Sequence, residues 1–374
     1  MKNSIKKILI THSSNDYYGA SKVLINTIDI FINNGFDIYL MLPNNGPLNA
    51  NQIIKKTNLK IINLGVFRKK YFTFFGMINR LYFIIKSYLY IKKFLKKNQI
   101  DLVYTNTSTL ISPLIAAKFS GIPSISHIHE IPNTNFIYVR FITTFLNFFA
   151  RDVICVSQSV YDFWIKNRLK KSKAKIIHNG FNIKKSKSKT LNNDKIVFTS
   201  ISRLIPYKGH SLLIRIFEIL CKKNEKIYLQ IVGDTLPQYQ KYFNELKSDI
   251  KKRKLNNKIK FLGFKHDVIS ILDKSNFFIH TPLSPDPLPT VIFEAIKCKI
   301  PVITNSLGGA YEILDKGKNG LIIKNDLVCE SVEKILSYLD DKKQQRKNVQ
   351  KAFNYVYINF SQEKFKRKVL NTIG

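Results

Sequence analysis

The segment KIVFTSISRLIPYKGHSLLIRIFEIL, residues 195–220, carries the signals that decide the fold. Its first seven residues are apolar and β-branched and predict a strand, whereas SLLIRIFEIL, 211–220, has the apolar spacing of an amphipathic helix. The turn between them contains Arg203, Lys208 and Gly209. A strand-to-helix turn is the usual place for an α/β protein to bind an anion, because backbone N–H groups and the helix dipole point toward it. The turn therefore predicts a phosphate site.

Strand-like and helix-like segments alternate along the whole chain. Apolar, β-rich runs are separated by amphipathic stretches such as 20–35 and 237–252. This alternation implies parallel sheets covered by helices on both faces. We expect an α/β protein with two doubly wound, Rossmann-like domains that face each other across a cleft, with the ligand at the carboxyl ends of the strands. The predicted strands are IKKILIT, DIYLMLP, KIINLG, DLVYTNT, PSISHIHE, DVICVSQ, KIVFTSIS, IYLQIVGD, IKFLGF, FFIHTP, PVITNS and GLIIK.

The segment NGFNIKKSKSKTLNNDK, 179–195, separates two halves that are built alike. Its apolar periodicity stops and Lys, Ser and Asn dominate, which is typical of a linker. A chain of 374 residues is also longer than one ordinary core needs. We assign an N-terminal Rossmann-like domain to 1–185, a C-terminal one to 186–350, and a helix that packs back toward the N-terminal domain to 351–374.

The chain is strongly basic, with 61 Lys and Arg against 25 Asp and Glu, a formal net charge of +36. Nucleic acid, an anionic membrane surface and phosphorylated small molecules are the partners that such a charge favours. An A/T-rich genome is an alternative explanation for the many lysines, because Lys, Asn, Ile, Phe and Tyr have A/T-rich codons and are abundant together here. The scattered cysteines predict neither disulfides nor a structural metal. We find no apolar run of 18 residues and no signal-peptide pattern, and we expect a cytoplasmic protein.

Two acids and a helix start mark a second candidate segment, SPDPLPTVIFEAIKCKIPVIT, 284–304. Asp286 and Glu294 lie eight positions apart, and the loop between them runs into a predicted helix. The backbone N–H groups of Thr290 and Val291 would lack acceptors inside that helix and suit a phosphate. Glu294, one turn later, could accept two hydrogen bonds from a ribose diol. The alternative is an ordinary carboxylate near a helix start.

Arg203 and Lys208 offer two different cation geometries. A guanidinium can bind two oxygens of one phosphate, and a flexible ammonium can follow the other phosphate of a diphosphate. The alternative is a pair of solvated loop cations.

The spacing S-R-L-x-x-x-K-G, followed by LQIVGD, FLGF, D-x7-E and A-I-K-C-K-I-P-V-I-T-N-S-L-G-G, resembles the retaining glycosyltransferases of family four, of the bacterial surface-polysaccharide type, which have the GT-B fold. The resemblance covers nearly the whole chain and is strongest from 196 to 325. It implies that Arg203 and Lys208 bind the donor diphosphate and that Glu294 binds the nucleotide ribose. Asp286 would contact the donor sugar and support charge near the anomeric carbon.

Three features depart from the family pattern. Asp286 stands where the family usually has Glu, Lys299 stands where Gly is common, and PDPLPT replaces the commoner E-P-F-G. Because Asp is one methylene shorter than Glu, the identity of the donor sugar is the expectation that this change weakens most.

The first half offers two further candidates. Gly19 and Ala20, in YYGASKVLI, are similar to the family's glycine-containing loop near the donor phosphate, although an ordinary strand-to-helix turn would look the same. SISHIHE, 124–130, supplies His129 at a strand end, where the family often has a histidine that contacts the donor sugar. A structural histidine is the alternative.

The resemblance implies transfer of a sugar from a nucleotide-sugar, expected to be UDP-linked, to a hydroxyl with retention of configuration. In this family the N-terminal domain binds the acceptor and the C-terminal domain binds the donor. No Asp-x-Asp metal site follows a strand, so we expect neither a metal nor another cofactor, with the cations stabilising the leaving diphosphate. A GT-B nucleotide-sugar epimerase is an alternative.

Aromatic and basic residues are mixed densely in 67–98, and FIYVRFITTFLNFFA, 136–150, is a second aromatic stretch. This composition suits an interfacial element on an anionic membrane, and the alternative is core helices with basic side chains at their edges. We expect a peripheral protein on the inner leaflet whose acceptor is a lipid-linked saccharide of capsule or lipopolysaccharide assembly. The rival class is a nucleic-acid-binding protein, but no helix-turn-helix, RNP or zinc pattern occurs, and we expect no nucleic acid partner.

Overall fold

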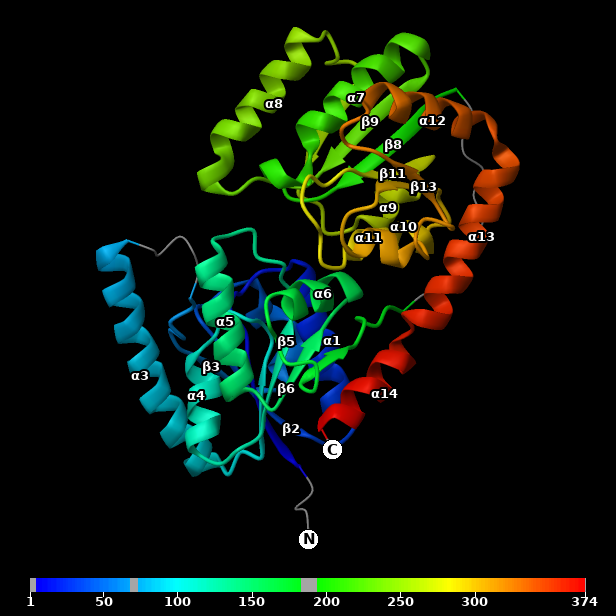
Figure 1. The fold of residues 1–374 in the computed structure, drawn as a ribbon. Coiled ribbons are helices and arrows are strands. Elements are labelled where there is room, and N and C mark those ends of the chain that lie inside the picture. The colour runs from blue at the N-terminus through cyan, green and yellow to red at the C-terminus, as the bar shows by residue number, and fades with distance from the viewer. Residues whose placement is uncertain (1–4, 68–72, 183–193, 374) are drawn as a thin grey trace. The chain divides into compact units, whose positions relative to one another are not determined.

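The computed structural model describes residues 5–67, 73–182 and 194–373 (Figure 1). The chain divides into two compact units. The first unit combines Met1–Gly180 with Gln362–Gly374, and the second unit is Phe181–Ser361. The boundary expected between 185 and 186 lies outside the described residues.

The first unit is built on a seven-stranded sheet in the order β3-β2-β1-β4-β5-β6-β7. All of its strand pairs are parallel, with β1 and β4 at the centre. Apolar side chains of these central strands are fully buried, because helices cover both faces of a parallel sheet. The strands are β1 (Lys7–Thr11), β2 (Asp37–Leu42), β3 (Asn58–Ile61), β4 (Leu102–Thr105), β5 (Ser124–Ile128), β6 (Asp152–Cys155) and β7 (Ala174–Ile176).

Helices connect these strands, as the right-handed crossovers of a parallel sheet require. They are α1 (Gly19–Ile32), α2 (Gln52–Lys55), α3 (Phe74–Asn98), α4 (Ser112–Phe119), α5 (Phe136–Phe149) and α6 (Gln158–Lys166). The alternative interpretation of 67–98 as core helices holds for one face only: the described part forms one 25-residue helix, α3, which packs Ile91 and Leu95 into the core and exposes many other apolar side chains.

The second unit repeats this architecture with six strands in the order β10-β9-β8-β11-β12-β13, again all parallel. The strands are β8 (Ile196–Ile201), β9 (Ile227–Val232), β10 (Ile259–Gly263), β11 (Phe277–His280), β12 (Val302–Asn305) and β13 (Leu321–Ile323). The helices are α7 (His210–Lys223), α8 (Gln240–Lys252), α9 (Ile269–Leu272), α10 (Thr290–Lys297), α11 (Gly309–Ile313), α12 (Val328–Asp340) and α13 (Lys342–Asn359). The predicted strand-turn-helix at 195–220 is therefore β8, its loop and α7.

The C-terminal region forms two helices where one was expected. α13 ends at Asn359, and α14 (Gln362–Ile373) begins after a break at Phe360 and Ser361. α14 belongs to the first unit, where Phe365, Val369 and Ile373 join its apolar core.

The predicted strands all correspond to observed ones, with differences at the sheet edges. KIINLG was expected at 60–65, whereas β3 is Asn58–Ile61, an edge strand whose side chains are mostly exposed. The three-residue edge strand β7 was not predicted. Edge strands bury few side chains, so apolar runs locate them poorly. In the described part of the chain, no helix is both long and apolar enough to cross a membrane.

Candidate active site

The loop after β8 holds the cationic residues that the sequence indicated. It passes through a short 3₁₀ turn, Pro206–Lys208, and reaches Gly209, which caps α7 with φ of 76°. A Cβ atom at Gly209 would lie 1.8 Å from the carbonyl oxygen of Thr281, so only glycine allows this approach. The Leu283 N–H donates to the Tyr207 carbonyl at 2.9 Å. The loops after β8 and β11 are thus held against each other.

This approach brings Lys208 beside Asp286. The Lys208 ammonium donates to Asp286 Oδ2 in an ion pair whose side chains are only 18% and 13% exposed. His280 Nε2, at the end of β11, lies 3.3 Å from the same carboxylate oxygen. Burial alone would raise the pKa of Asp286, but Lys208 and His280 outweigh it and hold that pKa well below its usual value. Asp286 is therefore ionised at neutral pH.

Two glycines support the backbone of Asp286. The Gly309 N–H donates to the Asp286 carbonyl at 2.7 Å. A Cβ atom at Gly308, where φ is 69°, would lie 2.3 Å from that carbonyl oxygen. Sequence reasoning quoted this Gly-Gly pair but assigned it no role.

The start of α10 lies four residues after Asp286. Thr290 and Val291 are its first two residues, and Pro289 before them makes no side-chain cap. N–H groups in the first turn of a helix have no acceptor inside the helix and favour an anion. Glu294 lies one turn further along α10 and is half-buried. The expected phosphate and ribose contacts of these three residues remain predictions.

Arg203 is half-buried in the loop after β8. Burial raises the pKa of the Tyr207 phenol, while the charge of Arg203 lowers it and that of Asp286 raises it. Both charges thus act on Tyr207, so the second unit gathers Arg203, Lys208 and Asp286 around the loops after β8 and β11. That these cations bind a diphosphate is still a prediction.

The first unit carries a second polar cluster at the carboxyl ends of β1, β4 and β5. His129, directly after β5, shares a 2.9 Å hydrogen bond between its Nε2 and Asn106 Oδ1. Asn106 Nδ2 lies 3.2 Å from His12 Nδ1 and donates to the Ala20 carbonyl at 3.3 Å. His12 Nε2 lies 3.1 Å from Ser21 Oγ. These contacts join His129 to the first turn of α1, which begins at Gly19.

Sequence reasoning missed Asn106, His12 and Ser21 in this cluster. Each directly follows a strand or lies in the first turn of α1, and position after a strand is the signal that could have found them. The roles predicted for His129 at the sugar and for Gly19 at the phosphate are not tested by these contacts.

Two buried neighbours define the environment of His129. The ring of His127 lies 4.2 Å from it, centroid to centroid, and His127 Nδ1 is 2.7 Å from the Tyr104 hydroxyl. Glu130 Oε2 accepts from the His129 N–H at 3.1 Å. Burial lowers the pKa of His127 to about 3, and burial with the neighbouring histidines lowers the pKa of His129 well below its usual value. Both imidazoles are neutral at pH 7.

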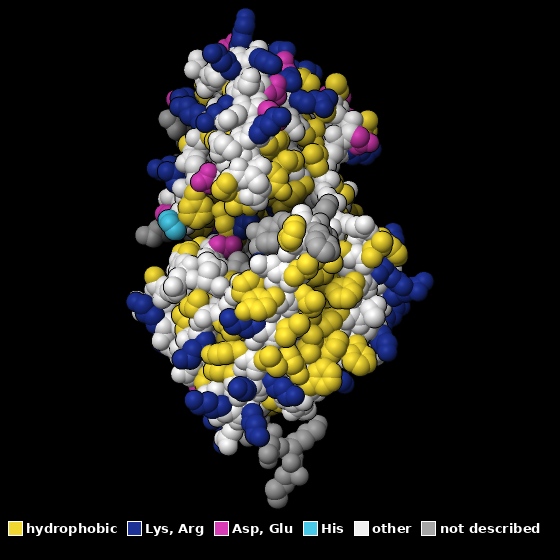
Figure 2. All heavy atoms as spheres, turned by 90° about the vertical axis from the view of Figure 1, so that its left-hand side faces the viewer, with side chains coloured by type: hydrophobic (Ala, Val, Ile, Leu, Met, Phe, Trp, Pro, Cys, Tyr) yellow, Lys and Arg dark blue, Asp and Glu magenta, His cyan; other side chains and the backbone are white. Residues whose placement is uncertain are grey.

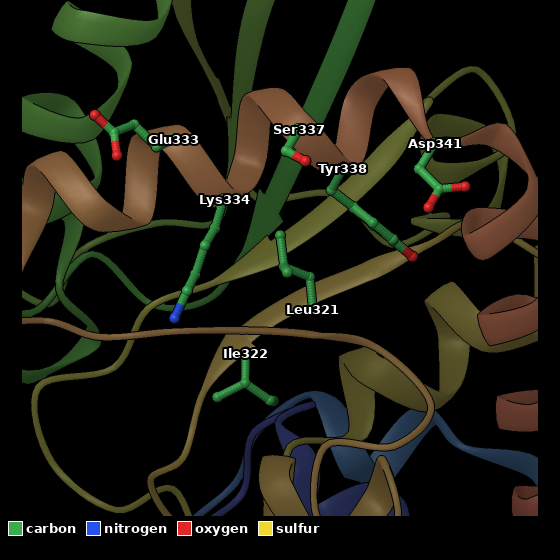
Figure 3. A pocket seen from close by; sticks show the side chains of 7 residues that line it. All are labelled: Leu321, Ile322, Glu333, Lys334, Ser337, Tyr338 and Asp341. Atoms are coloured by element: carbon green, nitrogen blue, oxygen red, sulfur yellow. The ribbon is translucent and has the colours of Figure 1, made fainter.

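Two surface hollows of the second unit contain none of the predicted site residues. The first has a volume of about 480 Å³ and lies between β13 and α12 (Figure 3). The second includes Ile196 and Lys223. Each includes the first residue of a strand, whereas ligands of doubly wound folds bind at the carboxyl ends. Residues lining the first hollow are Leu321, Ile322, Glu333, Lys334, Ser337, Tyr338 and Asp341.

Two family models cover most of the chain between them. The model described as "Glycosyltransferase Family 4" matches residues 17–185, and "Glycosyl transferases group 1" matches residues 181–355. The chain belongs to glycosyltransferase family four. Its two parallel-sheet Rossmann-like units are those of the GT-B fold, as the sequence predicted.

Similar proteins agree with this membership. An Escherichia coli protein named UDP-Gal:alpha-D-GlcNAc-diphosphoundecaprenol alpha-1,3-galactosyltransferase is 26% identical over 95% of this chain and 96% of its own length. The Saccharomyces cerevisiae phosphatidylinositol N-acetylglucosaminyltransferase GPI3 subunit is 25% identical over 62% of this chain and 54% of its own length. The crystal structure of Anabaena Alr3699/HepE in complex with UDP superposes with a TM-score of 0.81, 24% identity, and coverage of 98% and 99% of the two chains.

Proposed function

We propose that this glycosyltransferase moves a sugar from a UDP-linked donor to a hydroxyl of a lipid-linked glycan acceptor, with retention of anomeric configuration and without a metal ion. The observation that carries the proposal is the ion pair between Lys208, in the loop after β8, and Asp286, in the loop after β11. Asp286 also lies four residues before the start of α10. It combines a cation for a diphosphate with a carboxylate for the sugar attached to it.

In the proposed reaction, the bond from the anomeric carbon to the diphosphate breaks and the acceptor oxygen bonds to that carbon on the same face. The acceptor's proton leaves with the diphosphate. Arg203, Lys208 and the N–H groups of Thr290 and Val291 stabilise the negative charge that develops on the leaving group. These cations and amides supply the stabilisation that a metal ion gives in other transferases, so we propose metal-independent transfer.

We assign Asp286 and His129 to the donor sugar, Glu294 to the ribose and Gly19 to the donor phosphate. Asp286 stays ionised beside Lys208 and can stabilise positive charge near the anomeric carbon. His129 is neutral and can hydrogen-bond a sugar hydroxyl.

The lipid-linked acceptor is supported by the names of the relatives. The Escherichia coli protein is named for an acceptor on diphosphoundecaprenol, and the yeast subunit for phosphatidylinositol. A lipid-linked acceptor places the protein peripherally on the inner face of the cytoplasmic membrane. We propose a role in assembling a surface polysaccharide such as capsule or lipopolysaccharide.

A thermal-shift panel of nucleotide-sugars tests class and donor together. We expect a UDP-sugar to raise the melting temperature and its GDP, ADP and CMP analogues to leave it unchanged, with the same result in EDTA. Incubating that donor with undecaprenyl-diphosphate-linked saccharides should release UDP, and NMR of the product should show the anomeric configuration of the donor.

Three results would contradict the proposal. Salt-dependent binding of DNA without any nucleotide-sugar binding favours a nucleic-acid-binding protein. An epimerised sugar without transfer favours an epimerase. An inverted product removes the retaining mechanism.

A further inference from the structure

α3 presents an apolar stripe to solvent in the first unit. Its side chains are spaced three and four residues apart and therefore share one face of the helix. The opposite face is the buried one, with Ser87, Ile91 and Leu95. The stripe and its exposed fractions are Phe75 (82%), Ile78 (54%), Tyr82 (56%), Ile85 (50%) and Leu89 (56%).

α5 also exposes apolar side chains on the face that is turned away from the core. Ile137, Phe141, Thr144 and Phe148 repeat at intervals of four, three and four residues and are all exposed. Ile137 is 73%, Phe141 50% and Phe148 62% exposed, and the adjacent Phe136 is 65% exposed. The residues between them pack inward, so α5 covers the sheet with one face and exposes aromatic rings on the other.

Phe119, at the end of α4, is an exposed aromatic residue that contacts both α3 and α5 beside their stripes. It is 62% exposed, and its ring centroid lies 6.5 Å from that of Tyr88 in α3 and 6.4 Å from that of Phe149 in α5. Figure 2 shows the resulting surface as a gathering of yellow side chains with dark-blue basic residues around it. We call it the apolar face: Phe75, Ile78, Leu81, Tyr82, Ile85 and Leu89 of α3, Phe119 of α4, and Phe136, Ile137, Phe141 and Phe148 of α5.

The charged residues of the three helices that form the apolar face all have one sign. α3, α4 and α5 contain no Asp or Glu. The stripe of α3 continues at the same spacing into Lys93 and Lys96, so one face of this helix changes from apolar to basic toward its C-terminus. The basic residues of the three helices are Arg80, Lys86, Lys92, Lys93, Lys96, Lys97, Lys118 and Arg140.

We propose that the apolar face inserts into the interfacial layer of an anionic phospholipid bilayer while the basic residues around it contact lipid headgroups. The inference rests on the proposed function, since a lipid-linked acceptor requires the enzyme at a membrane. Aromatic rings beside Lys and Arg, on three helices that contain no acidic residue, match a surface with apolar chains under negative headgroups. A second copy of the chain fits poorly, because it would bring two basic rims together.

Insertion and electrostatic attraction respond differently to salt. Attraction between Lys or Arg and anionic lipid is screened as the Debye length shrinks, whereas burial of apolar side chains is not. We therefore expect vesicle binding to weaken with salt but to keep a salt-resistant part that depends on the apolar face.

A tryptophan reporter tests insertion directly. The chain has one Trp, Trp164, which is fully buried, so the wild-type background should not change on membrane binding. Ile137→Trp should show a blue-shifted emission with phosphatidylglycerol vesicles, and brominated lipid should quench it. Ile358→Trp is the matched control, because Ile358 of α13 is 65% exposed and outside the apolar face. It should show neither effect.

Matched double variants test the energetics. Phe136→Ser with Ile137→Ser should weaken binding to phosphatidylglycerol vesicles in high salt at least about tenfold in co-sedimentation. Tyr357→Ser with Ile358→Ser removes a similarly exposed pair, 61% and 65%, from α13 and should leave binding unchanged. Replacing Lys92, Lys93, Lys96 and Lys97 by Gln should weaken binding in low salt and have little effect in high salt.

Failure of this inference is distinguishable from failure of the proposed function. Absence of vesicle binding, equal binding by both serine variants, or sedimentation as a dimer without lipid would overturn insertion, even if UDP-sugar binding and transfer persist. Insertion with no response to any nucleotide-sugar would instead overturn the proposed function.

Discussion

Both units place polar side chains at the carboxyl ends of a parallel sheet. The second unit pairs two charged side chains there, whereas the first unit links mainly uncharged ones. The second unit holds an ionised pair, Lys208 and Asp286, with His280 beside it. The first unit holds a network of His129, Asn106, His12 and Ser21, in which burial keeps the imidazole of His129 unprotonated, and the carboxylates of Glu130 and Asp16 accept hydrogen bonds at its edges. A shared architecture therefore fixes where a ligand can bind, whereas the local residues decide whether the site suits charged or hydroxyl-bearing parts of that ligand.

The largest effects should come from the charged site. Lys208→Ala and Glu294→Ala should each reduce kcat/KM for the UDP-sugar at least about a hundredfold, because each removes a proposed charged contact with the donor. Circular dichroism should show that both variants stay folded. Turnover near the wild-type value in either one would remove the donor-site assignment and erase the contrast between the units.

Gly209→Ala tests the loop contact that builds the charged site. Its Cβ would meet the Thr281 oxygen in a backbone with φ of 76°, so we expect a loss of about 2–4 kcal/mol in the free energy of unfolding. Gly263→Ala is the control, because φ is 68° there but no atom lies within 4 Å, and it should cost about 1 kcal/mol. Equal losses in chemical denaturation would mean that the contact with Thr281 is unimportant.

Asn106→Ala tests the hydrogen-bond network around His129 in the first unit. It removes the partner of His129 Nε2, and we expect kcat to fall about tenfold, since a misplaced hydrogen-bond donor weakens transition-state contacts. Binding of UDP alone, measured by calorimetry, should change much less than kcat, because UDP carries no donor sugar and this network meets the proposed phosphate contact only through the first turn of α1. UDP binding weakened as much as kcat would show that the network contributes to the nucleotide site as well.

The pH dependence of stability should report the buried histidines. Burial lowers the pKa of His127 in the first unit to about 3, and burial with nearby Lys208 and His280 lowers that of His210 in the second unit to about 3. Below about pH 6.5 the unfolded chain binds protons that the folded chain does not. As the pH falls, each histidine should therefore lower the free energy of unfolding by up to about 1.4 kcal/mol per pH unit. His127→Gln and His210→Gln should each reduce the slope of the free energy of unfolding against pH, measured by chemical denaturation between pH 6 and pH 4.

Asp286 does not contribute to the pH dependence of stability between pH 6 and pH 4. Its lowered pKa adds stability that is lost only as the pH falls below about 4, the ordinary value for an aspartate. An unchanged slope in both histidine variants would show that these imidazoles are already protonated in the folded protein.

Asp286→Glu should have the smallest effect on folding, about 1 kcal/mol or less, because the longer side chain can still reach Lys208. It restores the acid that the family usually has, and we expect a change in preference among UDP-sugars, measured by competition between donors. An unchanged donor profile would indicate that residue 286 does not contact the sugar.

The sequence by itself was sufficient for the fold, and it pointed to the residues of the charged site, whose roles as donor ligands remain predictions. Repeated strand-helix alternation specifies parallel sheets, and charged residues at fixed spacing identified Arg203, Lys208, Asp286 and Glu294. Lys299 is a further case, because its φ of 53° explains why glycine is common at that position in the family.

Only the tertiary structure decided which residues meet and which faces stay open. Asn106 and His12 are 94 positions apart and become neighbours because β1 and β4 pair in the sheet. Periodicity also could not tell which face of α3 or α5 is buried, since both faces carry apolar residues. Apolar spacing records that side chains share a side of a helix, but whether that side meets a sheet or the solvent depends on elements distant in the chain.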